Sequence, residues 1–182
     1  MSSFTFNTSS YGPIVADLLS EARLPELGPG RPNVGIEPRL RSLTVDQLFV
    51  GRQIIDRQLA QCCRSALWLW HDFLDESHAL SQEIATVEGS YWHGIMHRRE
   101  PDYTNARYWF RRVRQHSVFQ TLSAQVEVNK LLGSPAWDPS LFTDQCAGIA
   151  ACQSDRESLA REVARLEWQV LFDFCFRGAA TI

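Results

Sequence analysis

Residues that can bind ions or move protons are concentrated between Glu88 and His116. This span holds three of the chain's five histidines, and it has six arginines but only three acidic residues. Its balance is therefore +3, whereas the whole chain carries a formal charge of −3. Large aromatic side chains are interleaved with these polar ones. Packing alone seldom requires such a combination, so we expect a binding or catalytic site here.

Two histidines in this span have the spacing of metal ligands on a helix. His93 and His97 are four residues apart, so a helix would present both imidazoles on one face. Glu100 follows one turn later, although Pro101 disfavours helical geometry at that position. His78 continues an apolar stripe of an earlier helix and is the candidate third ligand. We therefore predict a divalent metal ion, zinc, iron or nickel, bound by His78, His93 and His97.

Other interpretations of these histidines stay open. His71 and Asp75 lie near His78 in the sequence and form a competing ligand set. No glutamate follows His93 directly, so the pair is not the HExxH motif of zinc proteases. The imidazoles would alternatively be structural, each hydrogen-bonded to a carboxylate or to the backbone. Metal-free acid–base chemistry is a third option, because an ordinary histidine titrates near neutral pH.

Charged and aromatic neighbours of the histidines supply the remaining candidate groups. Arginine binds carboxylate or phosphate through paired hydrogen bonds, so it suits an anionic substrate. The alternative is that the arginines form salt bridges and the aromatic residues belong to the core. The predicted catalytic residues are Glu88, Arg98, Arg99 and Glu100. The predicted substrate-binding residues are Tyr91, Trp92, Asn105, Tyr108, Trp109 and Arg112.

Composition restricts the class of protein. The 182 residues suit one domain, and 45% hydrophobic residues suffice for a buried core. A chain with a pI near 5.9 is not expected to bind nucleic acid or an anionic membrane. No segment has the ~20 apolar residues of a membrane span, and residues 1–10 lack the pattern of a signal peptide. We expect a cytoplasmic protein. A small-molecule substrate and a second copy of the chain are both possible partners.

The cysteines do not form a recognisable framework. Their number is odd and they include no CxxC pair, which argues against both a disulfide scaffold and a thiolate zinc site. We expect buried free thiols. The five are Cys62, Cys63, Cys146, Cys152 and Cys175.

The elements that must position the candidate residues are helices. Residues 1–43 are expected to form an irregular arm, with one short helix from Pro13 to about Arg23. The Gly/Pro-rich stretch over 25–38 admits no regular element, and it is expected to wrap over the body or pack against a partner. Residues 44–182 carry several amphipathic segments and no strand alternation. The predicted fold is an all-α, single-domain helical bundle with an irregular Gly/Pro-rich N-terminal arm.

Apolar periodicity and capping residues set the expected helix boundaries. A long central helix is predicted after a capping box of Thr44 and Gln47, with a break or a bend of its start at Gly51, and it reaches Ser77 or Gln82. The helix of the histidine pair is expected to run from Ser90 to before Pro101. Four later helices are expected. The first is capped by Asp102 or Thr104, and the second spans Val118–Leu132 before Gly133. The third begins at Asp138 and Pro139, and the last runs from a capping box of Ser154 and Glu157 to before Gly178.

The block from Glu88 to Arg112 resembles a recurring pattern of uncharacterised bacterial and fungal proteins. That pattern is similar to YWHGIMHRREPDYxNAxYWFRR and is preceded by a stretch like Ser77, His78 and Gln82. The resemblance covers about a third of the chain, from about Leu67 to Phe119. It implies no substrate or catalytic assignment, because no activity is established for that family.

A second resemblance is to DinB-like metal-dependent helical bundles. These proteins place one histidine on an early helix and an HxxxH pair, often followed by arginine, on a later one. The resemblance implies that His78 matches the first histidine and that His93 and His97, followed by Arg98, match the pair. The present chain departs from that pattern because Pro101 stops the histidine helix early and the surrounding tryptophans are foreign to it.

Two functions from different classes are consistent with the sequence. The first is a metal-dependent helical-bundle enzyme that acts on a small, anionic substrate through the histidine cluster. The second is a non-enzymatic binding or scaffold protein, in which the block of histidine, arginine and aromatic residues is structural or forms a partner interface. RNA binding through arginine and aromatic stacking is disfavoured by the acidic charge.

Overall fold

Helices, most of them short, make up the greater part of the chain. The computed structural model describes residues 4–152 and 155–181, and these ranges contain eleven α-helices and two strands of two residues each. The predicted all-α class is therefore confirmed. Strands β1 (Gln53–Ile54) and β2 (Ala180–Thr181) pair antiparallel, with Ile54 opposite Ala180, and so tie the end of the last helix to an early loop.

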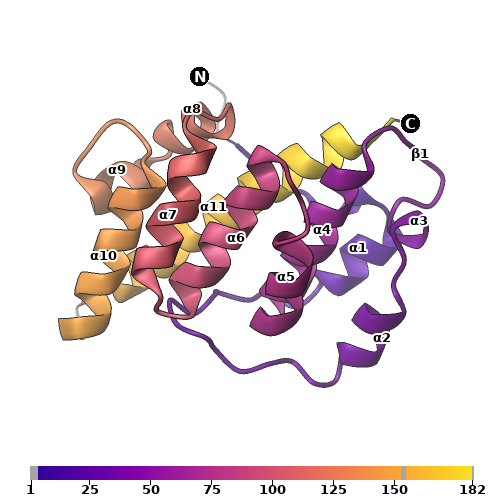
Figure 1. Cartoon of the computed structure of the whole chain (residues 1–182), viewed down its shortest axis with the longest axis horizontal. Coiled ribbons are helices and arrows are strands. Elements are labelled where there is room, and N and C mark those ends of the chain that lie inside the picture. Colours follow the sequence, from indigo (N-terminus) through magenta and orange to yellow (C-terminus); the bar gives the residue numbers. More distant parts are fainter. Residues whose placement is uncertain (1–3, 153–154, 182) are drawn as a thin grey trace.

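A 3₁₀ turn at Thr8–Tyr11 precedes the helices, and a long connection separates the first helix from the second. Their bounds are α1 (Pro13–Leu18), α2 (Glu37–Ser42), α3 (Val45–Leu48), α4 (Arg57–Trp70), α5 (Leu74–Ser81), α6 (Val87–Arg99), α7 (Tyr103–Val113), α8 (Val118–Ser123), α9 (Val126–Leu132), α10 (Pro139–Cys152) and α11 (Glu157–Ala179). Helices α4, α5, α6 and α7 lie side by side, and α11 crosses behind them (Figure 1).

Several predicted caps are present. Thr44 and Gln47 form the capping box of α3, and the Asp102 carboxylate accepts a hydrogen bond from the backbone N–H of Asn105. Asp138 caps α10 at Pro139, and Gly133 ends α9 in the left-handed conformation. These ends are fixed by local interactions, which explains why the sequence predicts them.

The long central helix predicted after Thr44 breaks near Gly51, which was one of two expectations there, but its unbroken continuation to Ser77 or Gln82 is wrong, because the chain breaks a second time. It turns between α3 and α4, and it turns again between α4 and α5 at His71, Asp72 and Phe73. Asp72 has a φ of 66°, which no helix can contain. The apolar stripe runs through this break, so periodicity alone does not reveal it. The break gives α5 its own direction relative to α4.

Partners far away in the sequence hold this break. The Asp72 carboxylate accepts hydrogen bonds from Arg23 and Arg99, each at 2.6 Å. The preceding His71 ring bonds through Nε2 to the Leu18 carbonyl at 3.0 Å. Because Arg23 and Leu18 belong to the N-terminal arm, the same contacts that stop α4 also attach the arm to the helical body.

The Gly/Pro-rich stretch wraps over the body, which was one of its two predicted placements. Arg99 donates to the carbonyls of Gly28 and Pro29, and Arg161 donates to those of Leu24 and Pro25. The stretch is irregular up to Ile36, but the prediction of no regular element over 25–38 is wrong at its end, because α2 begins at Glu37 with Pro38 in its first turn. The proposed domain boundary between residues 43 and 44 stays a prediction.

Other predicted boundaries are corrected by the structure. The helix predicted over 118–132 is two helices, α8 and α9. Helix α6 begins after Thr86 rather than Ser90, since the Thr86 hydroxyl caps the Gly89 N–H at 3.1 Å. Helix α1 ends at Leu18, and α11 continues through Gly178 to Ala179. Ser154, half of a predicted capping box, lies outside the described residues.

The core sits between α4, α6 and α11. Trp92 of α6 and Trp70 of α4 both pack against Trp168 of α11, with ring centroids 6.1 Å and 4.5 Å apart. A buried ion pair joins Arg98 of α6 to Glu167 of α11. Cys62, Cys63, Cys146 and Cys175 are buried free thiols, as predicted, and the Cys152 side chain lies outside the described residues.

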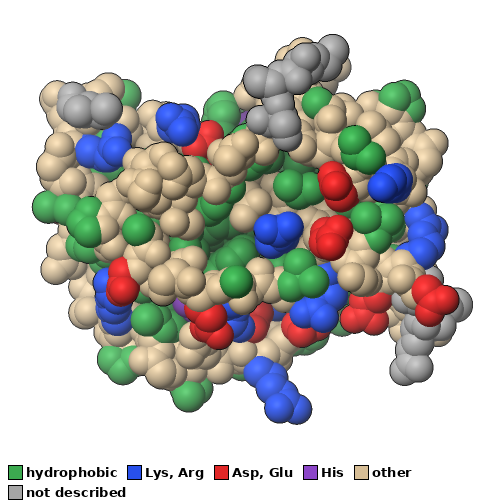
Figure 2. All heavy atoms as spheres, turned by 180° about the vertical axis from the view of Figure 1, so that it is seen from behind, with side chains coloured by type: hydrophobic (Ala, Val, Ile, Leu, Met, Phe, Trp, Pro, Cys, Tyr) green, Lys and Arg blue, Asp and Glu red, His purple; other side chains and the backbone are tan. Residues whose placement is uncertain are grey.

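The face opposite the view of Figure 1 carries arginines and acidic side chains close to one another, with hydrophobic side chains between them (Figure 2). Opposite charges interspersed in this way partly neutralise each other. Among the described residues, no helix is both long and apolar enough to cross a membrane.

The Asp72 contacts lead to a stability prediction. Asp72→Ala should lower the free energy of unfolding by about 3 kcal/mol, because it leaves the buried Arg99 guanidinium without its carboxylate. Both side chains are only 6% exposed. Urea denaturation at neutral pH measures the effect. Asp144→Ala, which removes an exposed carboxylate from Arg107, should cost less than about 1 kcal/mol. Equal losses in the two variants would contradict a role for Asp72 in holding the break.

Candidate metal centre

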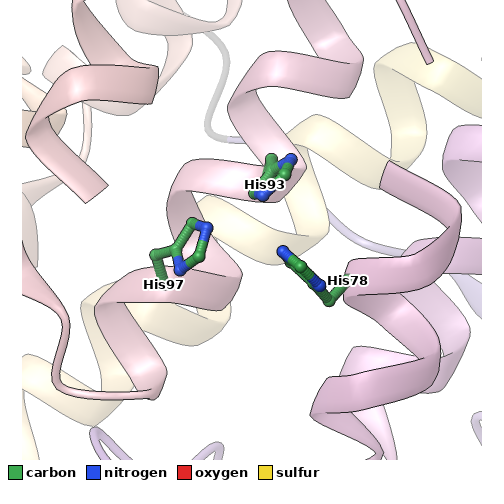
Figure 3. A group of neighbouring side chains, drawn as sticks. All are labelled: His78, His93 and His97. Atoms are coloured by element: carbon green, nitrogen blue, oxygen red, sulfur yellow. The ribbon is translucent and has the colours of Figure 1, made fainter. Parts of the chain in front are cut away.

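Three histidine rings meet where α5 and α6 face each other. His78 comes from α5, and His93 and His97 come from successive turns of α6 (Figure 3). The ring centroids are 4.7 Å apart for His78 and His93, 5.2 Å for His78 and His97, and 4.6 Å for His93 and His97. One ligand atom from each ring lies within 4.8 Å of those of the other two. The predicted set of three therefore comes together in space.

The positions of these rings follow from the helices that carry them. The four-residue spacing puts His93 and His97 on one face of α6. The break after α4 turns α5 so that His78 reaches the same point. Helix α7 packs closely on α6 because Gly94 has no side chain: a Cβ there would lie 2.5 Å from the Phe110 ring. This close approach brings the side chains of α7 onto the cluster.

Trp109 of α7 covers one ring of the cluster. Its ring stacks on His93 with centroids 4.0 Å apart and an interplanar angle of 14°. His93 in turn stacks on His97 at an angle of 23°. His93 and His97 are buried, and His78 is partly exposed. The cluster is therefore enclosed on the α6 and α7 side and more open at His78.

Two polar side chains contact His97. The Glu100 carboxylate lies 3.1 Å from its Nδ1, and the Asn105 amide nitrogen lies 3.1 Å from its Nε2. A carboxylate at Nδ1 fixes the proton there and leaves Nε2 as the ligand atom, which is how metal-binding histidines are commonly oriented. The Asn105 amide donates to the same lone pair that a metal would use, so this side chain must turn aside when a metal binds.

Burial keeps the imidazoles of His93 and His97 neutral. Desolvation, together with the nearby His97 and His78, lowers the pKa of His93 to about 3. Desolvation also lowers the pKa of His97, and the Glu100 carboxylate opposes this effect in part. Only a neutral imidazole has a lone pair for a metal. At neutral pH both α6 histidines are thus in the protonation state that ligation needs.

The three residues fit a metal ion in type and in arrangement. Neither His78 nor His93 has a hydrogen-bond partner for its ring among the described residues, and His93 Nδ1 is buried. Three nitrogens that bind one zinc ion tetrahedrally lie about 3.4 Å apart. Rotation about the side-chain bonds would supply the inward shift of about 1 Å per ring. The competing set of His71 and Asp75 does not form among the described residues, since His71 is tied to Leu18.

The other predicted catalytic residues lie apart from the cluster. Glu88 pairs with His116 at 3.3 Å, and Arg98 pairs with Glu167 in the core. Arg99 is engaged by Asp72 and by the backbone of the arm. Only Glu100, through His97, contacts the cluster. The catalytic assignments of these four residues stay predictions.

The predicted substrate-binding residues divide into two groups. Tyr91 and Trp92 are fully buried, and the Tyr91 hydroxyl accepts a hydrogen bond from Trp137 at 2.9 Å, so both belong to the core. Asn105 and Trp109 touch the histidines, as described above. Tyr108 and Arg112 lie in a surface groove next to Trp109. Their roles in substrate binding stay predictions.

Sequence reasoning missed the specific partnership of α6 and α7. Asn105 and Trp109 repeat the four-residue spacing of His93 and His97, and in two adjacent antiparallel helices such pairs face each other. That repeated spacing was the available signal. The partners of Arg98 and Arg99, Glu167 and Asp72, had no local signal.

Comparison of the chain with protein-family models, with curated proteins and with solved structures gave no match. The resemblance to the bacterial and fungal pattern stays a prediction. The function is therefore argued from the geometry of the cluster alone.

The lowered pKa of His93 sets a pH dependence of stability. Between about pH 6.5 and about pH 3 an unfolded chain protonates this ring and the folded chain does not, so stability falls as pH falls below about 6.5. His93→Gln should flatten the dependence of the urea midpoint from about pH 7.5 to about pH 5.5, where ordinary carboxylates remain ionised. The measurement requires a chelator in all samples. Identical slopes for wild type and variant would show that His93 does not titrate abnormally.

Proposed function

We propose that this chain is a metal-dependent enzyme whose centre is one divalent ion bound by His78, His93 and His97. The supporting observation is that three imidazoles from two helices converge on one partly buried point, while two of them have no hydrogen-bond partner among the residues that the structure describes. Histidine side chains are buried in many proteins, but each ring is then usually satisfied by protein or water. A shared ion would satisfy all three at once.

The ligand set indicates the type of metal. Neutral imidazole suits zinc, iron and nickel, whereas calcium and magnesium prefer oxygen ligands. Three protein ligands leave at least one coordination position open, which is the arrangement of catalytic rather than structural zinc sites. A metal in such a site acts as a Lewis acid and lowers the pKa of a bound water toward neutrality. The chemistry we propose is metal-assisted hydrolysis of a small molecule.

Each neighbouring residue has a role in this proposal. Glu100 holds the Nδ1 proton of His97 and so orients that ring. Trp109 packs on His93 and excludes water from that side. Asn105 lies beside the ligand nitrogen of His97, where its amide would hydrogen-bond a group at the open position. Arg98, Arg99 and Glu88 are left out, because their charges are engaged elsewhere.

The proposed centre is accessible from the surface. Glu100, which contacts His97, also lines a groove together with Asp75 and Asp102 at the ends of α5 and α6. His78 is the partly exposed member of the cluster, so water and a divalent cation would reach the histidines from its side. The carboxylates of the groove would attract a cation toward the site.

Metal titration of protein made without a histidine tag tests the proposal. We expect one divalent ion per chain, with an affinity that falls by at least about 100-fold in His93→Ala and in His78→Ala, because each removes a direct ligand. Competition with a chromophoric chelator for zinc measures the affinity. Glu100→Gln should weaken binding by about 10- to 100-fold, because it removes only the orienting carboxylate.

The control is His116→Gln, which removes a histidine that pairs with Glu88 away from the cluster. Its zinc affinity should equal that of the wild type. Circular dichroism of every variant separates loss of a ligand from loss of fold. Zinc binding that survives in folded His93→Ala and His78→Ala would refute the proposed centre.

A further inference from the structure

Three arginines at the end of α7 lack the acidic partners that many other arginines in this chain have. Arg111, Arg112 and Arg114 are exposed, and none forms an ion pair with a described residue. Arg107, one turn earlier, is held by Asp144. Three unpaired guanidinium groups within four residues form a local concentration of positive charge at the surface.

These arginines line a surface groove between the start of α6 and the end of α7. The polar groups of its wall are Thr86, Ser90, Tyr108, Arg111, Arg112 and Arg114, and no acidic residue in the described part of the chain contributes to it. The hollow measures about 480 Å³ and opens to solvent, a size that suits a small molecule. Glu88, the nearest acid in the sequence, bonds to His116 instead.

The groove lies next to the histidine cluster, on the other side of the Trp109 ring. Ser90, His93 and His97 follow one face of α6, and the facing residues of α7 are Arg112, Trp109 and Asn105 in antiparallel order. The Arg112 guanidinium lies 5.1 Å from the Trp109 ring centroid, and the same indole stacks on His93. One indole ring therefore separates the positive charge from the nearest imidazole.

We propose that this groove binds the anionic group of a small substrate, a carboxylate or a phosphate, whose reacting part then lies at the histidine cluster. The proposal deepens the function proposed above and rests on it for the reacting end. Arg111 and Arg112 supply the charge, and their N–H groups match the paired oxygens of either anion. The hydroxyls of Ser90 and Tyr108 are placed in the same wall to bond the anion or its neighbouring atoms.

The anion site is tested without metal. Inorganic phosphate and succinate are titrated separately into metal-free protein at low salt, and isothermal calorimetry measures the affinity. We expect saturable binding of at least one probe, weakened by about tenfold or more in Arg111→Gln/Arg112→Gln. Which probe binds better distinguishes phosphate from carboxylate. Arg31→Gln, which removes an exposed arginine of the arm with no ion pair among described residues, should leave the affinity unchanged.

Failure of this proposal differs from failure of the metal centre. The groove is not an anion site if neither probe binds, or if Arg111→Gln/Arg112→Gln binds the probe as well as Arg31→Gln does. Either result leaves the zinc affinity unchanged. The link between the two sites is tested on cobalt-loaded protein. We expect the better probe to shift the visible cobalt spectrum of the wild type but not of Arg111→Gln/Arg112→Gln. Binding of the probe without any spectral shift would overturn the placement of the substrate at the cluster.

Discussion

The Asp72 carboxylate is the contact on which the arrangement of the whole protein depends. The backbone of Asp72 is in the left-handed conformation between α4 and α5. Its carboxylate is bound by Arg23 from the arm and by Arg99 from α6. These charge-assisted bonds stabilise a break that the local sequence does not require. The break directs α5 toward α6. The position of His78, and with it the third side of the histidine cluster, follows from this one residue.

Helix α6 distributes its side chains among three structures. Consecutive residues of an α-helix point about 100° apart, so His97, Arg98 and Arg99 leave the helix in different directions. His97 joins the cluster, Arg98 reaches Glu167 on α11, and Arg99 reaches Asp72 and the arm. Both arginines are buried, which is costly unless their charge is compensated. The helix that carries two proposed ligands is therefore fixed from the core side and from the arm side.

Local interactions explain how much the sequence could predict. The all-α class, the caps at Thr44, Asp102 and Asp138, and the pairing of His93 with His97 all depend on residues within about one turn of each other. The inward direction of His78 was predicted from a stripe that continues from Trp70, although the helix behind that stripe is broken. The break and the burial of Arg98 depend on partners far away in the chain, Glu167 being 69 residues from Arg98. Arginine side chains are normally exposed, so the residue type also predicts the wrong burial for Arg98.

The docking of the Gly/Pro-rich arm has a consequence for its evolution. Arg99 and Arg161 bind it mainly through backbone carbonyls, those of Leu24, Pro25, Gly28 and Pro29. A carbonyl is present whatever the side chain, so most substitutions in these four positions would leave the attachment intact. The neighbouring Gly30 does not tolerate substitution in this way, because its φ is +75° and a Cβ would lie 2.7 Å from the Asp72 side chain. At these four positions natural selection therefore acts on the course of the main chain, and their side chains are free to drift so long as that course, Arg99 and Arg161 persist.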